Sequence, residues 1–119
     1  MTDDFLYHLV EVSLWGEKEA LAEDYKAPSL ASEGFIHCSF KNQVVSSWKK
    51  HFHRDPNLYV LKIRKASLKS RILVEDTYGS GQKFPHVYGP IEKEAVCEVI
   101  LISDFIHSLD ESLSKKRRP

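Results

Sequence analysis

Residues 58–102 read LYVLKIRKASLKSRILVEDTYGSGQKFPHVYGPIEKEAVCEVILI, and this stretch decides the fold. It holds four runs rich in residues that favour β-strands, namely Leu58–Ile63, Arg71–Glu75, Phe84–Ile91 and Ala95–Ile102. Turn-forming residues and a glycine-containing loop separate these runs. The second half of the chain is therefore predicted to supply most of a sheet.

The first half of the chain adds two helices. One helix is predicted over Trp15–Glu23, and Pro28 forces a break after it. The other is predicted over Asn42–Phe52, because apolar residues recur there at spacings of three and four. Strands are predicted over Phe5–Val12 and Gly34–Phe40. Helices early in the chain and strands late indicate an α+β fold with a largely antiparallel sheet.

The length and the charge pattern indicate how the chain is divided into a domain and a tail. A chain of 119 residues is predicted to form one α+β domain over residues 1–107. Residues 108–119 are predicted to be a flexible end with a short helix at 108–113 and a basic tail, Lys115–Arg118. Without that tail the chain has 13 basic and 17 acidic residues, and this excess of acidic residues argues against a broad nucleic-acid groove. The tail itself is either a solvated end or a contact for RNA, a membrane surface or an import receptor.

The composition also indicates a location and a redox state. The apolar run Val99–Ile102 is far shorter than the roughly 20 residues that a membrane-spanning helix needs. The acidic start, Met1–Asp4, lacks the basic region of a secretory signal, so a soluble cytoplasmic protein is expected. Cys38 and Cys97 form no disulfide framework and are expected to be buried free thiols.

Polar side chains on the run Gly34–Phe40 are the first candidate site residues. His37 and Ser39 share one face of their strand, while Ile36 and Cys38 share the opposite face, which should be core. Two polar groups on one strand face need partners or a ligand, because burying them without hydrogen bonds costs free energy.

Further candidates lie on three other runs. His86 and Tyr88 share a face of the Phe84–Ile91 run, and His8 lies between apolar neighbours in the first strand. Glu75 ends its strand beside the glycine loop. For each of these residues, a purely structural role with internal partners remains the alternative.

Three other chemistries have weaker sequence support. His51 and His53, joined by His37, Cys38 and His86, match no recognised metal-ligand spacing. A cysteine nucleophile is disfavoured because the side chain of Cys38 points away from that of His37. The loop at Gly79–Gly81 lacks the lysine and hydroxyl residue of a phosphate-binding loop.

Two motifs resemble a known family. The segment Glu33–Ser39 with Gln43, and the segment Phe84–Ile91, resemble the signatures of the family catalogued as domain of unknown function 952. The resemblance extends over residues 5 to 103. That family is distantly similar to the ADP-ribosyltransferase fold, which includes RNA 2′-phosphotransferases. The resemblance implies two small sheets, with early helices packed on them, in a split sandwich whose cleft holds NAD or an ADP-ribosylated intermediate.

The resemblance also implies roles for the candidate residues. His8 and Ser39 would bind the ribose and pyrophosphate of NAD, with His86 and Tyr88 beside them and Tyr88 stacked on a base. Glu75 would stabilise the positive charge that develops on the ribose, and His37 would act as a general acid or base. NAD would be a substrate, and the acceptor an RNA phosphate, a protein side chain or a small nucleotide.

A second hypothesis keeps the ligand without the chemistry. Val10 stands where the phosphotransferases usually have threonine, and no arginine precedes His37 as it does in them. The chain would then be a non-catalytic module that binds a nucleotide or a protein partner. Nicotinamide release from NAD separates the two hypotheses.

Overall fold

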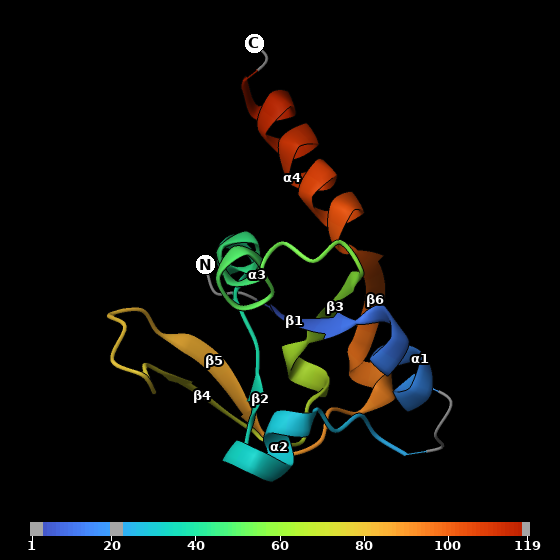
Figure 1. Cartoon of the computed structure of the whole chain (residues 1–119), viewed down its shortest axis with the longest axis vertical. Coiled ribbons are helices and arrows are strands. Elements are labelled where there is room, and N and C mark those ends of the chain that lie inside the picture. The colour runs from blue at the N-terminus through green and yellow to red at the C-terminus, as the bar shows by residue number, and fades with distance from the viewer. Residues whose placement is uncertain (1–3, 20–22, 118–119) are drawn as a thin grey trace.

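The computed structural model of the chain describes residues 4–19 and 23–117, with side chains through residue 110. Within these residues, six strands form two three-stranded sheets, and every strand pair is antiparallel. Four α-helices surround the sheets (Figure 1). This arrangement confirms the α+β class and the small antiparallel sheets.

The first sheet has the order β1-β3-β6, with β1 at Phe5–Glu11, β3 at Leu58–Arg64 and β6 at Val96–Leu101. Its central strand β3 pairs along its full length with β1, and a register shift at Lys62/Ile63 interrupts its pairing with β6. Side chains on both faces of β1 and β3 are buried. Such a strand needs cover on both sides of the sheet, which the second sheet and the helices provide.

The second sheet has the order β2-β5-β4, with β2 at Ile36–His37, β5 at Phe84–Tyr88 and β4 at Arg71–Glu75. The register places His37 opposite His86. The central strand β5 therefore carries the second sequence motif between β2, which holds His37, and β4, which holds Glu75.

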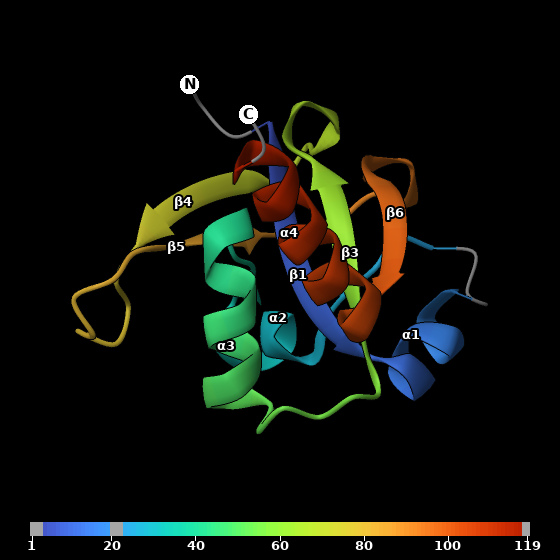
Figure 2. The same cartoon turned by 90° about the horizontal axis from the view of Figure 1, so that it is seen from above.

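The helices are α1 (Val12–Glu19), α2 (Pro28–Glu33), α3 (Val44–His51) and α4 (Ile102–Arg117). Short 3₁₀ turns occupy Lys41–Gln43, Lys65–Ser67 and Lys93–Ala95. Helix α4 extends away from the rest of the molecule at its C-terminal end (Figure 1). Helices α3 and α4 lie over the same face of the first sheet (Figure 2).

Two apolar clusters hold these layers together. The larger lies between the sheets and under α1, and includes Leu6, Trp15, Ile36, Leu61 and Val87. The smaller lies between the first sheet and helices α3 and α4, and includes Tyr7, Leu9, Val44, Val60, Ile102 and Phe105. Burial of these apolar side chains is the main favourable term for folding.

The two sheets are also joined through the backbone. Tyr7 of β1 and Ser39, two residues after β2, exchange hydrogen bonds of 2.9 and 2.7 Å. The chain therefore leaves the second sheet at His37 and reaches the first sheet at Ser39. The predicted strand Gly34–Phe40 is wrong in this respect, because only Ile36–His37 forms a strand and the rest of the run crosses between the sheets.

The structure corrects the predicted helices at their ends. Helix α1 begins at Val12, not Trp15, and the predicted residues 20–22 lie outside the described residues. Pro28 begins helix α2, which the sequence analysis did not predict; proline suits the first helical turn because its missing N–H would have no partner there. Gly34 ends α2 with a φ of 90°.

The remaining helix predictions also shift. The predicted helix Asn42–Phe52 is a 3₁₀ turn followed by α3, which stops at His51. Helix α4 begins at Ile102, not Ser108, because Ile102 and Phe105 bury their side chains against the first sheet. No helix among the described residues is long and apolar enough to span a membrane.

Cysteine burial agrees with the prediction at one position only. Cys38 is buried in the cluster between the sheets, and burial raises the pKa of its thiol to about 12. Cys97 is exposed, so the expectation that both thiols are buried is wrong. Cys97 lies on β6, an edge strand of the first sheet, where fewer neighbours cover the side chains.

Candidate functional site

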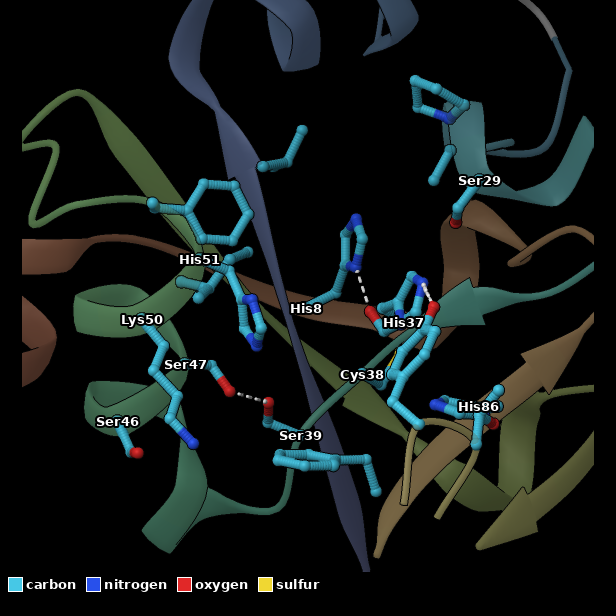
Figure 3. A pocket seen from close by; sticks show the side chains of 18 of the residues that line it. His8, Ser29, His37, Cys38, Ser39, Ser46, Ser47, Lys50, His51 and His86 are labelled. Carbon is cyan, nitrogen blue, oxygen red and sulfur yellow. Dashed lines mark hydrogen bonds between the residues drawn. The ribbon is translucent and has the colours of Figure 1, made fainter. Parts of the chain in front are cut away.

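A cleft of about 690 Å³ opens between β1, helix α3, β2 and the loop that joins β4 to β5. Figure 3 shows labelled side chains from β1, β2, α3 and β5 around it. Of the predicted site residues, five line the cleft: His8, His37, Ser39, Glu75 and His86. Tyr88 is not among the lining residues and reaches the cleft only through Glu75. Tyr88 therefore lies beside the cleft, and its predicted contact with a ligand stays a prediction.

His37 belongs to a cluster of three polar side chains at the mouth of the cleft. Its Nε2 donates to Glu33 Oε2 over 3.0 Å, and the hydroxyl of Tyr78 donates to the other oxygen of Glu33. The ring of Tyr78 stacks against His37, with centroids 6.0 Å apart. The turn at Gly34 brings the end of α2 back onto β2, which is why Glu33 and His37 meet.

This cluster keeps Glu33 ionised. The Tyr78 hydroxyl, and after it His37, hold the pKa of the Glu33 carboxyl below its ordinary value. The same hydrogen bond raises the pKa of Tyr78 to about 12. In a neutral imidazole whose Nε2 donates to a carboxylate, Nδ1 is the nitrogen that carries the lone pair. No hydrogen bond to Nδ1 exists within the described residues, and 40% of the side chain is exposed.

His86 has a matching arrangement on β5. Its Nδ1 donates to Glu75 Oε2 over 2.9 Å, and the Tyr88 hydroxyl donates to the same oxygen. The Tyr88 hydrogen bond, and to a smaller extent the His86 hydrogen bond, hold the pKa of Glu75 below its ordinary value. The carboxylate in turn raises the pKa of Tyr88. Among the described residues, neither Nε2 of His86 nor Oε1 of Glu75 has a hydrogen-bond partner. Each histidine therefore has one nitrogen held by a carboxylate and one open.

Phe35 joins the two clusters. Its ring stacks on His86 with centroids 4.1 Å apart and meets His37 edge-on at 4.9 Å. The two imidazoles themselves are 5.2 Å apart, centroid to centroid. Phe35 is buried, so this packing limits the movement of both rings.

His8 lies deeper in the wall and is fully engaged. Its Nδ1 donates to the His37 carbonyl over 2.6 Å, and its Nε2 accepts from the Tyr25 hydroxyl over 2.8 Å. Burial lowers the pKa of His8 to about 4 and raises that of Tyr25. His8 is thus a neutral imidazole that ties β1 to β2 and has no nitrogen left for a ligand.

Ser39 is the last predicted residue in the cleft. It is buried, and its Oγ lies 3.4 Å from the Oγ of Ser47 on α3 (Figure 3). His37 and Ser39 line the cleft and Ile36 belongs to the core cluster, as predicted, whereas Cys38 belongs to the core cluster and also lines the cleft.

The candidate metal ligands are scattered. His51 and His53 are both exposed, and His53 is not a lining residue of the cleft that holds His37 and His86. Among the described residues, no three His, Cys, Asp or Glu side chains are placed to hold a metal ion together.

Comparison with known proteins agrees with this fold and these motifs. The model of the family described as protein of unknown function (DUF952) matches residues 10–99, which include both sequence motifs. The chain belongs to this DUF952 family. No curated protein matches the chain.

Two solved structures resemble this DUF952 chain. The crystal structure of protein CC0527 from Caulobacter crescentus is 28% identical, with a TM-score of 0.68 over 82% of this chain and 84% of that one. The solution structure of CC0527 is 25% identical, also with a TM-score of 0.68, and covers 82% and 83% of the two chains. The DUF952 chain therefore shares its fold with CC0527 over most of both lengths.

Sequence reasoning missed several residues of this DUF952 site. Glu33, Phe35 and Tyr78 complete the two histidine clusters, and Tyr25 holds His8. Glu33 lies within the first motif, so its identity was visible, but its partner Tyr78 is 45 residues away in sequence. No local pattern predicts such a contact, because it depends on how the β4–β5 loop folds over β2.

Proposed function

We propose that this protein binds NAD or ADP-ribose in the cleft and transfers the ADP-ribosyl group to an acceptor. One observation carries the proposal: two imidazoles, each held by a carboxylate, lie 5.2 Å apart beside an open carboxylate oxygen. A volume of about 690 Å³ lies within the range typical of ligand pockets. The resemblance to the ADP-ribosyltransferase fold supports the choice of ligand.

Glu75 is the group we assign to the developing charge. When the bond between ribose C1′ and nicotinamide breaks, nicotinamide leaves with the bonding electron pair and the ribose gains positive character. The lowered pKa keeps Glu75 ionised at neutral pH, and among the described residues its Oε1 has no hydrogen-bond partner. A carboxylate in that position stabilises the oxocarbenium-like transition state.

His37 is the group we assign to proton transfer. The acceptor oxygen or nitrogen forms its new bond to C1′ and gives up a proton, which the open Nδ1 of His37 takes. Glu33 holds the ring with the proton on Nε2, which is the tautomer that a base at Nδ1 requires. His86 and Ser39 would contact the ligand, and His8 would act indirectly by positioning β2.

A non-catalytic binding module is the second candidate. It is favoured by the occupancy of the polar groups, since both oxygens of Glu33 and both nitrogens of His8 already have partners. Such a module would bind ADP-ribose and leave NAD intact.

Melting curves and nicotinamide release test the proposal. NAD, ADP-ribose and a 2′-phosphorylated dinucleotide are each added at millimolar concentration; a ligand at 100 times its Kd adds about 2.7 kcal/mol, a rise of several degrees. Nicotinamide release is then followed for the wild type, Glu75→Gln and the control Glu98→Gln, an exposed carboxylate paired with Lys62.

We expect binding in all three proteins and release in all but Glu75→Gln. Binding of ADP-ribose with no release by the wild type would favour the non-catalytic module. No melting shift with any of the three ligands would overturn the proposal.

A further inference from the structure

One face of helix α3 forms a wall of the cleft that the proposed chemistry does not use. Ser47, Lys50 and His51 are spaced at i, i+3 and i+4, so their side chains lie on the same helix face. All three line the cleft. In Figure 3, Ser47 and His51 extend from α3 toward Ser39, and Lys50 runs alongside them.

The donors on this wall are available. Among the described residues, neither Lys50 nor His51 has a hydrogen bond or an ion pair. Ser47 and Ser39 contact each other at 3.4 Å, a long hydrogen bond that two hydroxyls readily exchange for bonds to a charged oxygen. The wall thus presents an ammonium group, an imidazole and two hydroxyls to one space.

Three acidic residues, Glu11, Glu75 and Asp76, also line the cleft. Asp76 is engaged with the amides of Ser80 and Gly81, and Glu75 is engaged with His86. Glu11, at the end of β1, is the remaining acidic lining residue. Helical side chains lean toward the helix N-terminus, so the Lys50 ammonium lies away from the carbonyl end of α3, which would repel an anion.

We propose that Lys50, His51, Ser47 and Ser39 form an anion subsite that binds the pyrophosphate of a nucleoside diphosphate ligand. The inference rests on the proposed function, since it names where the phosphates of NAD or ADP-ribose lie. The ligand then spans the cleft, with its phosphates on α3 and its reacting ribose beside Glu75. The ammonium group of Lys50, on its flexible side chain, and the hydroxyl donors of Ser39 and Ser47 are groups that suit phosphate oxygens.

Binding by calorimetry to the full chain tests the subsite. The probes are NAD, ADP-ribose, nicotinamide riboside, which lacks the pyrophosphate, and inorganic pyrophosphate. The variants are Lys50→Gln and His51→Asn, singly and together. Lys49→Gln is the matched control, because Lys49 is exposed on the same helix turn and does not line the cleft.

Lys50→Gln is expected to weaken the binding of NAD, ADP-ribose and pyrophosphate, with a Kd about tenfold higher or more. This is the loss typical of one charge-assisted hydrogen bond. Nicotinamide riboside should bind all variants alike, and Lys49→Gln should match the wild type. The double variant binding pyrophosphate and NAD as tightly as the wild type would overturn the inference.

The two proposals can fail separately. If the wild type binds pyrophosphate but not NAD, and Lys50→Gln loses pyrophosphate, the anion subsite stands and the proposed function fails. If NAD binds and nicotinamide is released equally in the wild type and the double variant, the function stands and the subsite is wrong. If the wild type binds none of the four probes, both are wrong.

Discussion

The two sheets of this protein have the same number of strands and the same antiparallel pairing, yet their side chains differ. Side chains on both faces of β1 and β3 in the first sheet are buried, mostly in apolar clusters. The second sheet carries two histidines, Glu75 and Tyr88 toward or beside the cleft. The difference indicates that the first sheet supplies most of the stability, while the second presents polar side chains toward or beside the cleft.

Histidines show the same contrast. His8, on the first sheet, is buried with both nitrogens bonded and a pKa lowered to about 4. His37 and His86, on the second sheet, each have one nitrogen held by a carboxylate and one open. A histidine can exchange a proton with a ligand only through a ring nitrogen that the ligand can reach.

Paired leucine truncations would test the contrast most strongly. Leu61, fully buried on β3, and Leu73, half-buried on β4, are each replaced by alanine. Leu61→Ala is expected to lower the free energy of unfolding by about 4 kcal/mol, because it removes a core side chain and leaves a cavity. Leu73→Ala should cost less than half as much. Equal losses in urea unfolding would contradict the division of roles between the sheets.

The buried histidine predicts a pH dependence. The pKa of His8 falls from 6.5 in the unfolded chain to about 4 in the folded one, so the unfolded chain binds more protons between these values. The free energy of unfolding therefore drops as pH falls from 6.5 to 4, by at most about 3 kcal/mol.

Urea unfolding of the wild type and His8→Asn at several pH values measures this effect. The advantage of the wild type over the variant should shrink as pH falls through the window. Glu33 and Glu75, whose pKa values are lowered, lose their contribution only below their unfolded value of about 4.5. An identical pH slope in His8→Asn would show that His8 does not titrate in this way.

The tyrosine–carboxylate contacts of the second sheet predict the smallest effect. Tyr78→Phe removes a hydroxyl donor from Glu33, so the pKa of Glu33 should rise toward its ordinary value. Stability should change by less than about 0.5 kcal/mol, because Tyr78 is 66% exposed.

The matched variant for this measurement is Tyr88→Phe, which should raise the pKa of Glu75 and leave Glu33 unchanged. Carboxyl titration by NMR reports both groups. A shift of Glu33 in Tyr88→Phe would mean that the two clusters are coupled through Phe35.

Much of the fold was predictable from local patterns. The runs that form β3 and β4 are rich in apolar residues, either consecutive or alternating with polar ones. The apolar residues of α3 recur at helical spacing. Helix α2 was not predictable in this way, since it is only six residues long and is defined by Pro28 and Gly34 at its ends. The early start of α4 was missed because Ile102 continues the apolar run of β6.

The candidate site was predictable in part. Strand phase placed His37 with Ser39 on one face, and the structure has both in the cleft. The same reasoning did not show that Tyr88 lies beside the cleft, on Glu75, because strand phase gives the face of a strand and not the edge of the cavity. It also treated His8 like the other histidines, since nothing local indicates that Tyr25 and the His37 carbonyl hold its ring.

The sequence by itself determined the α+β class, the main strands and the residue types from which a site is built. These follow from side-chain periodicity and turn chemistry, which act over a few residues. Only the tertiary structure decided which polar groups remain open. Contacts such as Tyr78 with Glu33, His86 with Glu75 and Ser39 with Ser47 depend on how distant segments pack. That packing occupies both ring nitrogens of His8 and leaves one nitrogen of His37 and one of His86 without a hydrogen-bond partner among the described residues.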